Sequence, residues 1–334
     1  MTDPAFPRII RPPATGAPGI ASVIDGLREQ VPALIDSLRR HGALLLRGFD
    51  IANAGDFARL VPLFPGQAID YVGGAVPRTR INDIVFSSTE LTRIAKIQLH
   101  NELAYQRDYP DLVLFYCQKP AARGGETIIA DCRRILRDLD PALREKFLRT
   151  GVRYVRTFQE RRPLRERFKQ VVVLYHHLTW QAAFNTESRE AAAEKCRERG
   201  MTYDWRPNGD LRVIDRLPAI VDHPHTGEPS WFNQVVIQHF NRRNYGTIVY
   251  GFRRLVYRDP SGLPNQVFFG DGSEISRGEI HHIMDITERH TVTFPWQAGD
   301  VLILDNRLAA HGRNPYRGDR KVYVAMLRDP TEQM

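Results

Sequence analysis

The sequence lacks the features that mark membrane and secreted proteins. No apolar run approaches the ~18 residues that a membrane-spanning helix needs. Residues 1–20 are rich in Pro and Gly and contain no apolar segment typical of a secretory signal. Cys117, Cys132 and Cys196 cannot all pair and show no C-x-x-C spacing. We therefore expect a cytoplasmic protein with reduced thiols that neither spans nor binds a membrane.

Signatures of nucleotide and nucleic-acid binding are missing as well. The segment "GGAVPRTR", residues 73–80, contains glycines but lacks the G-x-G-x-x-G pattern of a dinucleotide site. No zinc-finger spacing or RNP-type aromatic pattern occurs, so nucleic acid is not an expected partner. The chain also has no internal repeat and no regular alternation of strands and helices, which argues against a doubly wound parallel sheet.

What is present is a globular composition, 42% hydrophobic, with strand patterns towards both ends of the 334-residue chain. Expected strands lie at 43–49, 111–120, 126–131, 211–214, 231–240, 266–270, 290–296, 300–305 and 320–329. Helical patterns cover 21–42, 133–170, 186–200 and 274–290.

These patterns predict a mainly β fold with helical insertions, whose core is a double-stranded β-helix of the jelly-roll, cupin-like type. We expect an extended tail over residues 1–20 and a single domain over 21–334. A basic helical insertion interrupts that domain around residues 133–200.

Positive charge is concentrated in part of this insertion. Residues 133–170 contain 13 Lys or Arg and 5 Asp or Glu, an excess of eight that equals the formal net charge of the whole chain. Two interpretations stay open. The charges can form a solvated helical face, or they can attract an acidic protein partner.

The segment "KIQLHNELAY", residues 96–105, has the alternation of a strand and contains His100 and Glu102. Side chains two positions apart on a strand share one face, so this pair could bind one metal ion. With 11 His and 39 acidic residues in the chain, about one such spacing is expected by chance. The alternative is that His100 packs in the core while Glu102 accepts a hydrogen bond.

A second histidine follows a strand near the end of the chain, in "DVLILDNRLAAHGRNPYRGDR". This segment contains His311, and Arg313 and Arg320 come after it. Two histidines and one carboxylate form the facial triad of non-haem Fe(II) oxygenases. An arginine nearby is suited to bind a carboxylate bidentately. A further candidate metal site, "DHPHTGE" at 222–228, contains Pro and Gly and is better explained as a loop.

Together these segments resemble the TauD/TfdA-like family of Fe(II)- and 2-oxoglutarate-dependent dioxygenases, including its clavaminate-synthase-like branch. The resemblance extends over most of the chain and leaves out the N-terminal tail and the basic segment. The matching stretches are "GALLLRGFD", "YVGGAVPRTR", "SSTE", "LHNELAY", "CQKPAARGGETIIADCR", "TGEPSWFNQ", "FGDGSEI", "WQAGDVLILDN" and "AHGRNPYRGDRK".

The resemblance implies roles for particular residues. His100, Glu102 and His311 would bind Fe(II), while Thr127 and Arg320 would hold 2-oxoglutarate. Candidate contacts to the substrate are Arg78, Ser88, Phe232 and Arg313. Phe232 can instead belong to the core, and Arg313 can instead be structural. Many relatives carry a second arginine four residues after the position of Arg320, where this chain has Val324.

The implied activity uses Fe(II), 2-oxoglutarate and O2 to hydroxylate an unactivated C–H bond of a small molecule. An amino acid or amino-acid derivative in natural-product biosynthesis is the expected substrate, either free or tethered to an acidic carrier protein. Desaturation, epoxidation or cyclisation would need the same cofactors. Halogenation is disfavoured because Glu102 keeps a carboxylate on the metal. A non-catalytic, cupin-like protein that binds a metal or carboxylate is the alternative from another class.

Overall fold

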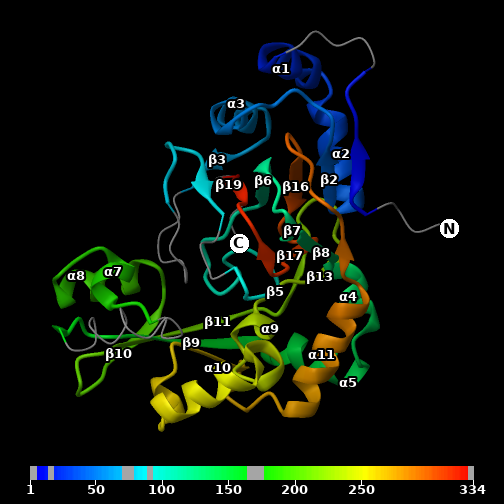
Figure 1. Cartoon of the computed structure of the whole chain (residues 1–334). Coiled ribbons are helices and arrows are strands. Elements are labelled where there is room, and N and C mark those ends of the chain that lie inside the picture. Colours follow the sequence, from blue (N-terminus) through cyan, green and yellow to red (C-terminus); the bar gives the residue numbers. More distant parts are fainter. Residues whose placement is uncertain (1–5, 14–18, 70–78, 89–92, 164–176, 330–334) are drawn as a thin grey trace.

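The computed structural model describes residues 6–13, 19–69, 79–88, 93–163 and 177–329. Most of its strands lie in three sheets, of seven, four and four strands, and helices pack against them (Figure 1). The prediction of a mainly β fold with helical insertions is confirmed.

The seven-stranded sheet joins segments from both ends of the chain. Its strands follow the order β1-β2-β16-β6-β19-β3, and β4 also pairs with β19. Their bounds are β1 Arg8–Ile10, β2 Ala43–Leu46, β3 Gln67–Ala68, β4 Phe86–Ser87, β6 Leu112–Lys119, β16 Val301–Asp305 and β19 Lys321–Arg328. Strand β1 pairs in parallel with β2. Part of the expected N-terminal tail is thus an edge strand of this sheet.

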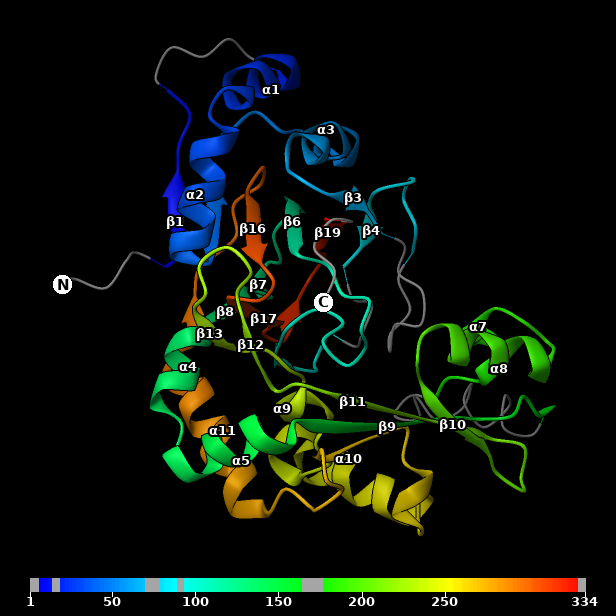
Figure 2. The same cartoon turned by 180° about the vertical axis from the view of Figure 1, so that it is seen from behind.

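Both faces of this sheet are covered, which explains why its central strands are apolar runs rather than alternating patterns. One face packs against helices α1 (Ile20–Arg28), α2 (Val31–His41) and α3 (Ala54–Leu60). These helices lie on one side of the sheet in both views of the chain (Figures 1 and 2). Leu44 and Leu46 of β2 face them, whereas Leu45 belongs to a second cluster on the opposite face.

That second cluster joins the large sheet to a four-stranded sheet with the order β15-β8-β17-β5. Its strands are β5 Ile97–His100, β8 Thr127–Asp131, β15 Val292–Thr293 and β17 Ala309–Arg313. Phe115 and Leu302 from the large sheet lie in one cluster with Ile129 and Ala309 from the small sheet. The two sheets therefore pack face to face. On the small sheet, His100 lies in β5 and His311 in β17, and Glu102 follows β5.

The third sheet corrects the prediction for residues 133–170. It has the order β10-β11-β9-β14, with bounds β9 Val152–Phe158, β10 Thr202–Trp205, β11 Leu211–Leu217 and β14 Asn265–Phe269. The expected basic helix is therefore wrong over 152–158, where β9 lies between β11 and β14. Arginines within β9 disguised its strand pattern. Arg156, for example, can be buried because its charge is neutralised by Asp215 of β11, which lies 2.9 Å away.

Two other expected elements differ from the structure. The helix predicted over 21–42 is divided into α1 and α2, because Pro32 in the first turn of α2 favours a new helix start. Helix α2 ends, as expected, at Gly42, which has φ 76°. The strand predicted over 231–240 ends at Trp231. A helical turn, α9, follows after the Asn233 side chain accepts a hydrogen bond from the Val235 N–H.

The remaining elements complete the chain. The helices are α4 Cys132–Asp138, α5 Pro141–Thr150, α7 Trp180–Phe184, α8 Arg189–Glu198, α9 Val235–Gln238, α10 Arg242–Val256 and α11 Arg277–Arg289, with short 3-10 turns at Val61–Leu63 and Pro260–Gly262. Two-stranded ribbons pair β7 (Arg123–Gly124) with β18 (Tyr316–Arg317) and β12 (Ile220–Asp222) with β13 (Pro229–Trp231). Within the described ranges, no helix has both the length and the apolar character to cross a membrane.

Candidate active site

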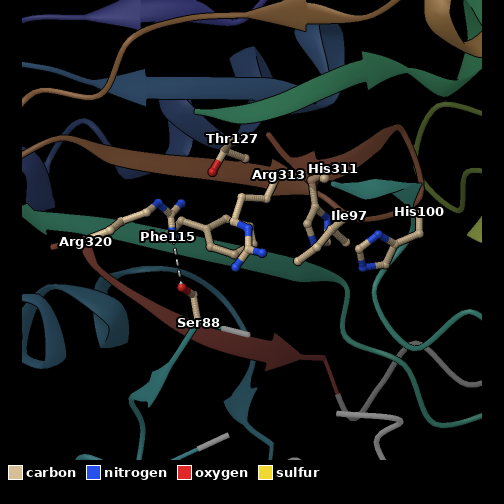
Figure 3. A pocket seen from close by; sticks show the side chains of 9 residues that line it. Ser88, Ile97, His100, Phe115, Thr127, His311, Arg313 and Arg320 are labelled. Atoms are coloured by element: carbon tan, nitrogen blue, oxygen red, sulfur yellow. Dashed lines mark hydrogen bonds between the residues drawn. The ribbon is translucent and has the colours of Figure 1, made fainter. Parts of the chain in front are cut away.

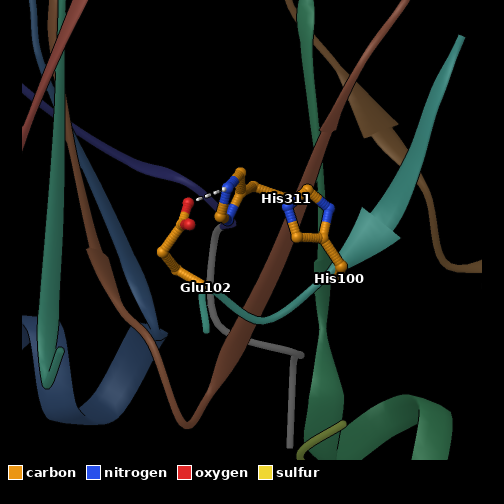
Figure 4. Close-up of side chains that lie close together, drawn as sticks. All are labelled: His100, Glu102 and His311. Carbon is orange, nitrogen blue, oxygen red and sulfur yellow. Dashed lines mark ion pairs between the residues drawn. The ribbon is translucent and has the colours of Figure 1, made fainter. Parts of the chain in front are cut away.

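The three predicted metal ligands meet where β5 and β17 pair. His100 lies opposite His311 in the antiparallel register of these strands. Their rings are 4.5 Å apart between centroids, and the Oε2 atom of Glu102 lies 3.4 Å from Nε2 of His311 (Figure 4). One ligand atom from each residue can be chosen so that all three lie within 4.8 Å of one another. The structure thus brings together residues separated by more than 200 positions in the sequence.

The local geometry differs from the expected strand. Strand β5 ends at His100, and Glu102 lies in the turn that follows. Leu103, the next residue, has φ 55°, a left-handed conformation that reverses the direction of the chain. The prediction that one strand presents both side chains is therefore wrong, although the two side chains do converge. The turn, rather than strand alternation, directs the carboxylate towards His311.

Burial and hydrogen bonding give the three side chains the character of metal ligands. Glu102 and His311 are buried, with 3% and 5% of their surface exposed. The Nδ1 atom of His100 lies 2.8 Å from the carbonyl oxygen of Gln98, a contact that fixes the orientation of the imidazole ring. Nδ1 of His311 is buried and has no hydrogen-bond partner among the described residues. A buried carboxylate beside such imidazoles is a donor set that fits a divalent iron ion.

A cleft with about 380 Å³ of empty space extends from the histidines (Figure 3). Its lining contains most of the side chains selected from the sequence, together with two apolar walls. The lining residues are Ser88, Ile97, His100, Phe115, Thr127, His311, Gly312, Arg313 and Arg320. Two of the three predicted metal ligands therefore line the same cavity as both residues predicted to hold 2-oxoglutarate.

Arg320 and Thr127, the two residues expected to hold 2-oxoglutarate, both line this cleft. Nε of Arg320 donates to the carbonyl oxygen of Gly125 at 2.8 Å, and one of its Nη atoms donates to Oγ of Ser88 at 3.3 Å. Burial, assisted by the nearby positive charge of Arg313, lowers the pKa of Arg320 to about 10. A carboxylate ligand would relieve both effects. Oγ1 of Thr127 accepts from Nε1 of Trp296 at 3.2 Å, so its hydroxyl hydrogen remains able to donate.

Arg313 and Gly312 fix the strand that presents His311. An Nη atom of Arg313 donates to the carbonyl oxygen of Ala95 at 3.1 Å, and burial lowers the pKa of Arg313. This residue thus has structural contacts as well as a place in the cleft. Gly312 allows close packing of β17 on β5, because a Cβ atom there would lie 2.4 Å from the carbonyl oxygen of Ile97.

Other predicted residues lie elsewhere. Phe232 is buried, its ring lies 4.6 Å from that of Tyr109, and it is not among the residues that line the cleft. Phe232 is therefore a core residue, as the second of its two interpretations predicted. Arg78 lies outside the described residues. Val324, where relatives carry a second arginine, is fully buried between the sheets. It supplies no charge to the cleft.

The loop at 222–228 is structural. His223 is buried, and its Nε2 atom lies 2.9 Å from Oδ2 of Asp305. Its Nδ1 atom accepts from the backbone N–H of Thr226 at 3.2 Å. Both ring nitrogens are therefore engaged within the fold. In the part of the chain that the structure describes, the only cluster with metal-binding geometry is that of His100, Glu102 and His311.

Several residues of the site were not selected from the sequence. Phe115 on β6 lies 5.0 Å from the His311 ring between centroids, and Ile97 forms part of the same lining. Both faces of β6 are apolar, so the sequence alone could not show that Phe115 faces the small sheet. Trp296 and Asn306 bond to Thr127 and to the backbone of Glu102, respectively. No local pattern indicates those long-range contacts.

A fold of facing sheets, a triad of two histidines and a carboxylate, and an arginine-lined cleft define a non-haem iron oxygenase. Sequence comparison assigns the family. The family model "Taurine catabolism dioxygenase TauD, TfdA family" matches residues 12–326. The chain therefore belongs to the TauD/TfdA family, and it is an Fe(II)- and 2-oxoglutarate-dependent oxygenase, as its resemblance to that family predicted.

Two curated relatives match nearly the full chain. The dapdiamide synthesis protein DdaC of Enterobacter agglomerans is 32% identical over 329 residues, which cover 96% of this chain and 94% of DdaC. A clavaminate synthase-like protein of Arabidopsis thaliana is 28% identical over 332 residues, with 97% and 94% coverage.

Solved structures share the fold. PvcB of Pseudomonas aeruginosa has a TM-score of 0.53 at 18% identity, with 97% of this chain and 90% of PvcB covered. An asparagine oxygenase complex has a TM-score of 0.54 at 12% identity, with 93% and 83% coverage. At these identities the likeness concerns the fold alone.

Proposed function

We propose that His100, Glu102 and His311 hold Fe(II), and that Thr127 and Arg320 bind 2-oxoglutarate in the adjoining cleft. The observation that carries this proposal is the continuity of the cavity. The cavity connects the two histidines with Arg320, whose pKa is lowered by burial. The two sheets around the cavity would then be the walls of a double-stranded β-helix. In this layout residues 21–334 form one domain, and β1 from the preceding segment joins its large sheet.

Each side chain has a separate part in the proposed reaction. Iron, with 2-oxoglutarate and dioxygen, supplies the oxidising power that converts a C–H bond to an alcohol while 2-oxoglutarate becomes succinate and carbon dioxide. Two imidazoles and one carboxylate provide three donors and leave positions open for other ligands. Arg320 orients a carboxylate through charge-assisted hydrogen bonds. Ile97 and Phe115 provide apolar walls that exclude water.

The substrate we propose is an amino acid or amino-acid derivative that is hydroxylated in the biosynthesis of a natural product. The support is the similarity to DdaC, whose name places it in dapdiamide synthesis, over nearly the full length of both chains. Desaturation, epoxidation and cyclisation use the same cofactors and differ in how the substrate lies.

The free, buried state of all three cysteines is compatible with a reducing cytoplasm.

Succinate production tests the proposed class and ligands without knowledge of the substrate. Anaerobically purified protein would receive Fe(II) and 2-oxoglutarate and then air. We expect slow succinate formation by the native chain and none by His100→Ala. Titration with iron and 2-oxoglutarate without oxygen is the second measurement. A chain that neither releases succinate nor binds both ligands in a His100-dependent way would refute the proposal.

A substrate tethered to an acidic carrier protein is the second candidate, favoured by the basic excess of residues 133–170. Several of these charges are neutralised within the fold. Arg133 pairs with Asp131 and Arg156 with Asp215. Arg161 is more exposed and pairs with Glu187, which is itself largely exposed.

Charge reversal tests this candidate. Arg161→Glu together with Arg162→Glu should slow turnover of an amino acid tethered to an acidic carrier domain and leave that of the free amino acid unchanged. Arg165, a third arginine close by in the sequence, lies outside the described residues. Equal effects on both substrates would rule out docking through these arginines.

A further inference from the structure

The turn that contains Glu102 needs support from outside its own strand. Strand β5 ends at His100, and the residues after it form turns with Leu103 in a left-handed conformation. A non-glycine residue with positive φ persists when surrounding contacts hold it. Glu102 itself is almost fully buried, so its backbone N–H and C=O also require partners.

Asn306 supplies both partners from its side chain. Its Oδ1 atom accepts from the Glu102 N–H at 2.7 Å, and its Nδ2 atom donates to the Glu102 carbonyl oxygen at 3.0 Å. A residue on a neighbouring strand would exchange the same two bonds through its backbone. Nδ2 also donates to the carbonyl oxygen of Pro110 at 2.8 Å. The carboxamide therefore replaces a strand partner at the point where β5 has ended.

The backbone of Asn306 is fixed by a second set of bonds. Its N–H donates to the carbonyl oxygen of Asp111 at 2.8 Å, and its carbonyl oxygen accepts from Nδ2 of Asn101 at 2.7 Å. Asn101 is held in turn, because its Oδ1 atom accepts from the Asn233 N–H at 3.2 Å and its carbonyl oxygen accepts from Nε2 of Gln234 at 2.8 Å. The side-chain amides of Asn101, Asn306 and Gln234 thus hold the segments around Glu102 and Asn306 together.

The same loop leads into β17, the strand that contains His311. Asn306 lies between β16 and β17, five positions before His311. The neighbouring Asp305 accepts from the N–H groups of Arg307 and Leu308 through Oδ1, and His223 contacts its other oxygen. Asn306 therefore connects the turn of the carboxylate ligand to the hairpin of the distal histidine.

We propose that Asn306 is a positioning residue that holds the carboxylate of Glu102 in place for metal binding beside His311. The proposal rests on the proposed role of His100, Glu102 and His311 as metal ligands. Its consequence is that loss of the Asn306 carboxamide weakens metal binding although all three ligands remain. Outer contacts of this kind alter metal affinity by roughly 10–100-fold.

The test uses Ni(II), which binds imidazole strongly enough to remain measurable after a ligand is removed. Calorimetric titration of tag-free protein would compare the native chain with Asn306→Ala. We expect the dissociation constant for Ni(II) to rise by roughly 10–100-fold. Asn306→Asp keeps an oxygen for the Glu102 N–H and loses the two donated bonds. It should give a smaller rise, and it carries the test if Asn306→Ala does not fold.

Two controls separate positioning from a general loss of stability. Asn241 is a buried amide that caps α10 through the Asn244 N–H, and its other hydrogen bonds go to His239 rather than to the three ligands. Asn241→Ala should lower the melting temperature and leave the Ni(II) affinity unchanged. In the Glu102→Gln background, the change of Asn306 to Ala should have little further effect on Ni(II) affinity, because the group it positions is no longer a carboxylate.

The outcomes distinguish the two proposals. Unchanged Ni(II) affinity in both Asn306 variants, or a loss that adds fully to that of Glu102→Gln, would overturn the positioning role. Unchanged affinity in both Glu102→Gln and His100→Ala would instead show that the triad is not the metal site. Asn306 would then have no ligand to position.

Discussion

Arg156 in the third sheet is buried and Arg320 in the cleft is partly buried, but within the described ranges only Arg156 has a carboxylate partner. Asp215 lies 2.9 Å from Arg156, and both side chains are nearly fully buried. Among the described residues, no carboxylate forms an ion pair with Arg320, which bonds to a carbonyl and a hydroxyl oxygen. Asp215 balances the buried charge of Arg156, whereas Arg320 has no ion-pair partner among the described residues. The same residue type therefore has a structural role in the third sheet, and we propose a binding role for it beside the small sheet.

The largest effect should come from breaking the internal pair. Arg156→Leu removes the ion-pair partner of the buried Asp215, and we expect the free energy of unfolding to fall by about 3–5 kcal/mol. Denaturant titration would measure the loss. Changing both residues to Leu should recover much of it, because neither charge is then buried. A single variant as stable as the native chain would contradict the assigned role.

Arg320→Gln should have the opposite profile, with little loss of stability and a clear loss of 2-oxoglutarate affinity. Hydrogen bonds to charged groups contribute about 1.5–3 kcal/mol, which corresponds to roughly 10–100-fold in the dissociation constant. Titration of the metal-loaded protein would measure it. Under the same conditions, 2-oxovalerate, which lacks the distal carboxylate, should bind both chains equally. If the variant weakens binding of both ligands alike, Arg320 does not contact that carboxylate.

The pH dependence of 2-oxoglutarate binding sharpens the comparison further. Because the pKa of Arg320 is lowered to about 10, the guanidinium is charged at neutral pH and loses its proton earlier than an exposed arginine. Affinity should be constant up to about pH 9 and then fall by up to about tenfold per pH unit above 10. Binding measured between pH 7 and 10.5 checks this. Arg320→Gln should lack this decline, and a decline shared by both chains would assign it to another group.

The smallest effect should come from an exposed pair. Arg161 and Glu187 are 2.7 Å apart, with about half or more of each side chain exposed. Surface pairs of this kind contribute at most about 1 kcal/mol, and salt screens them. Arg161→Ala should therefore lower the unfolding free energy by less than about 1 kcal/mol, and by less still in 0.5–1 M salt. A loss comparable to that of Arg156→Leu would remove the distinction between exposed and buried pairs.

The sequence predicted those parts of the fold in which one local pattern decides the structure. Strands β6, β16 and β19 are apolar runs buried on both faces, and the helix over 274–290 has a Ser276–Glu279 capping box in the structure. Strand β9 was missed because the charge of Arg156 is neutralised by a residue that follows 59 positions later. No local pattern reports such a contact.

The candidate site shows the same limit. His100, Glu102 and His311 were selected by residue type and resemblance, and the structure brings them together. The expected strand geometry of Glu102 was wrong, because its turn is set by Asn306 from a distant hairpin. For Phe232 the sequence left both substrate contact and a core position open, and the residue packs against Tyr109 in the core. Residue identity was thus readable from the sequence, and side-chain direction was not.

A 2-oxoglutarate site at Arg320 would have a consequence for the life of the protein in the cell. A ligand that binds only the folded chain stabilises it by an amount that grows with ligand concentration, about 2.7 kcal/mol at one hundred times the dissociation constant. If 2-oxoglutarate neutralises Arg320, it acts as a folding ligand as well as a reactant. Molecules without it unfold more often and are degraded sooner by proteases. The quantity of intact enzyme would then follow the supply of a central metabolite.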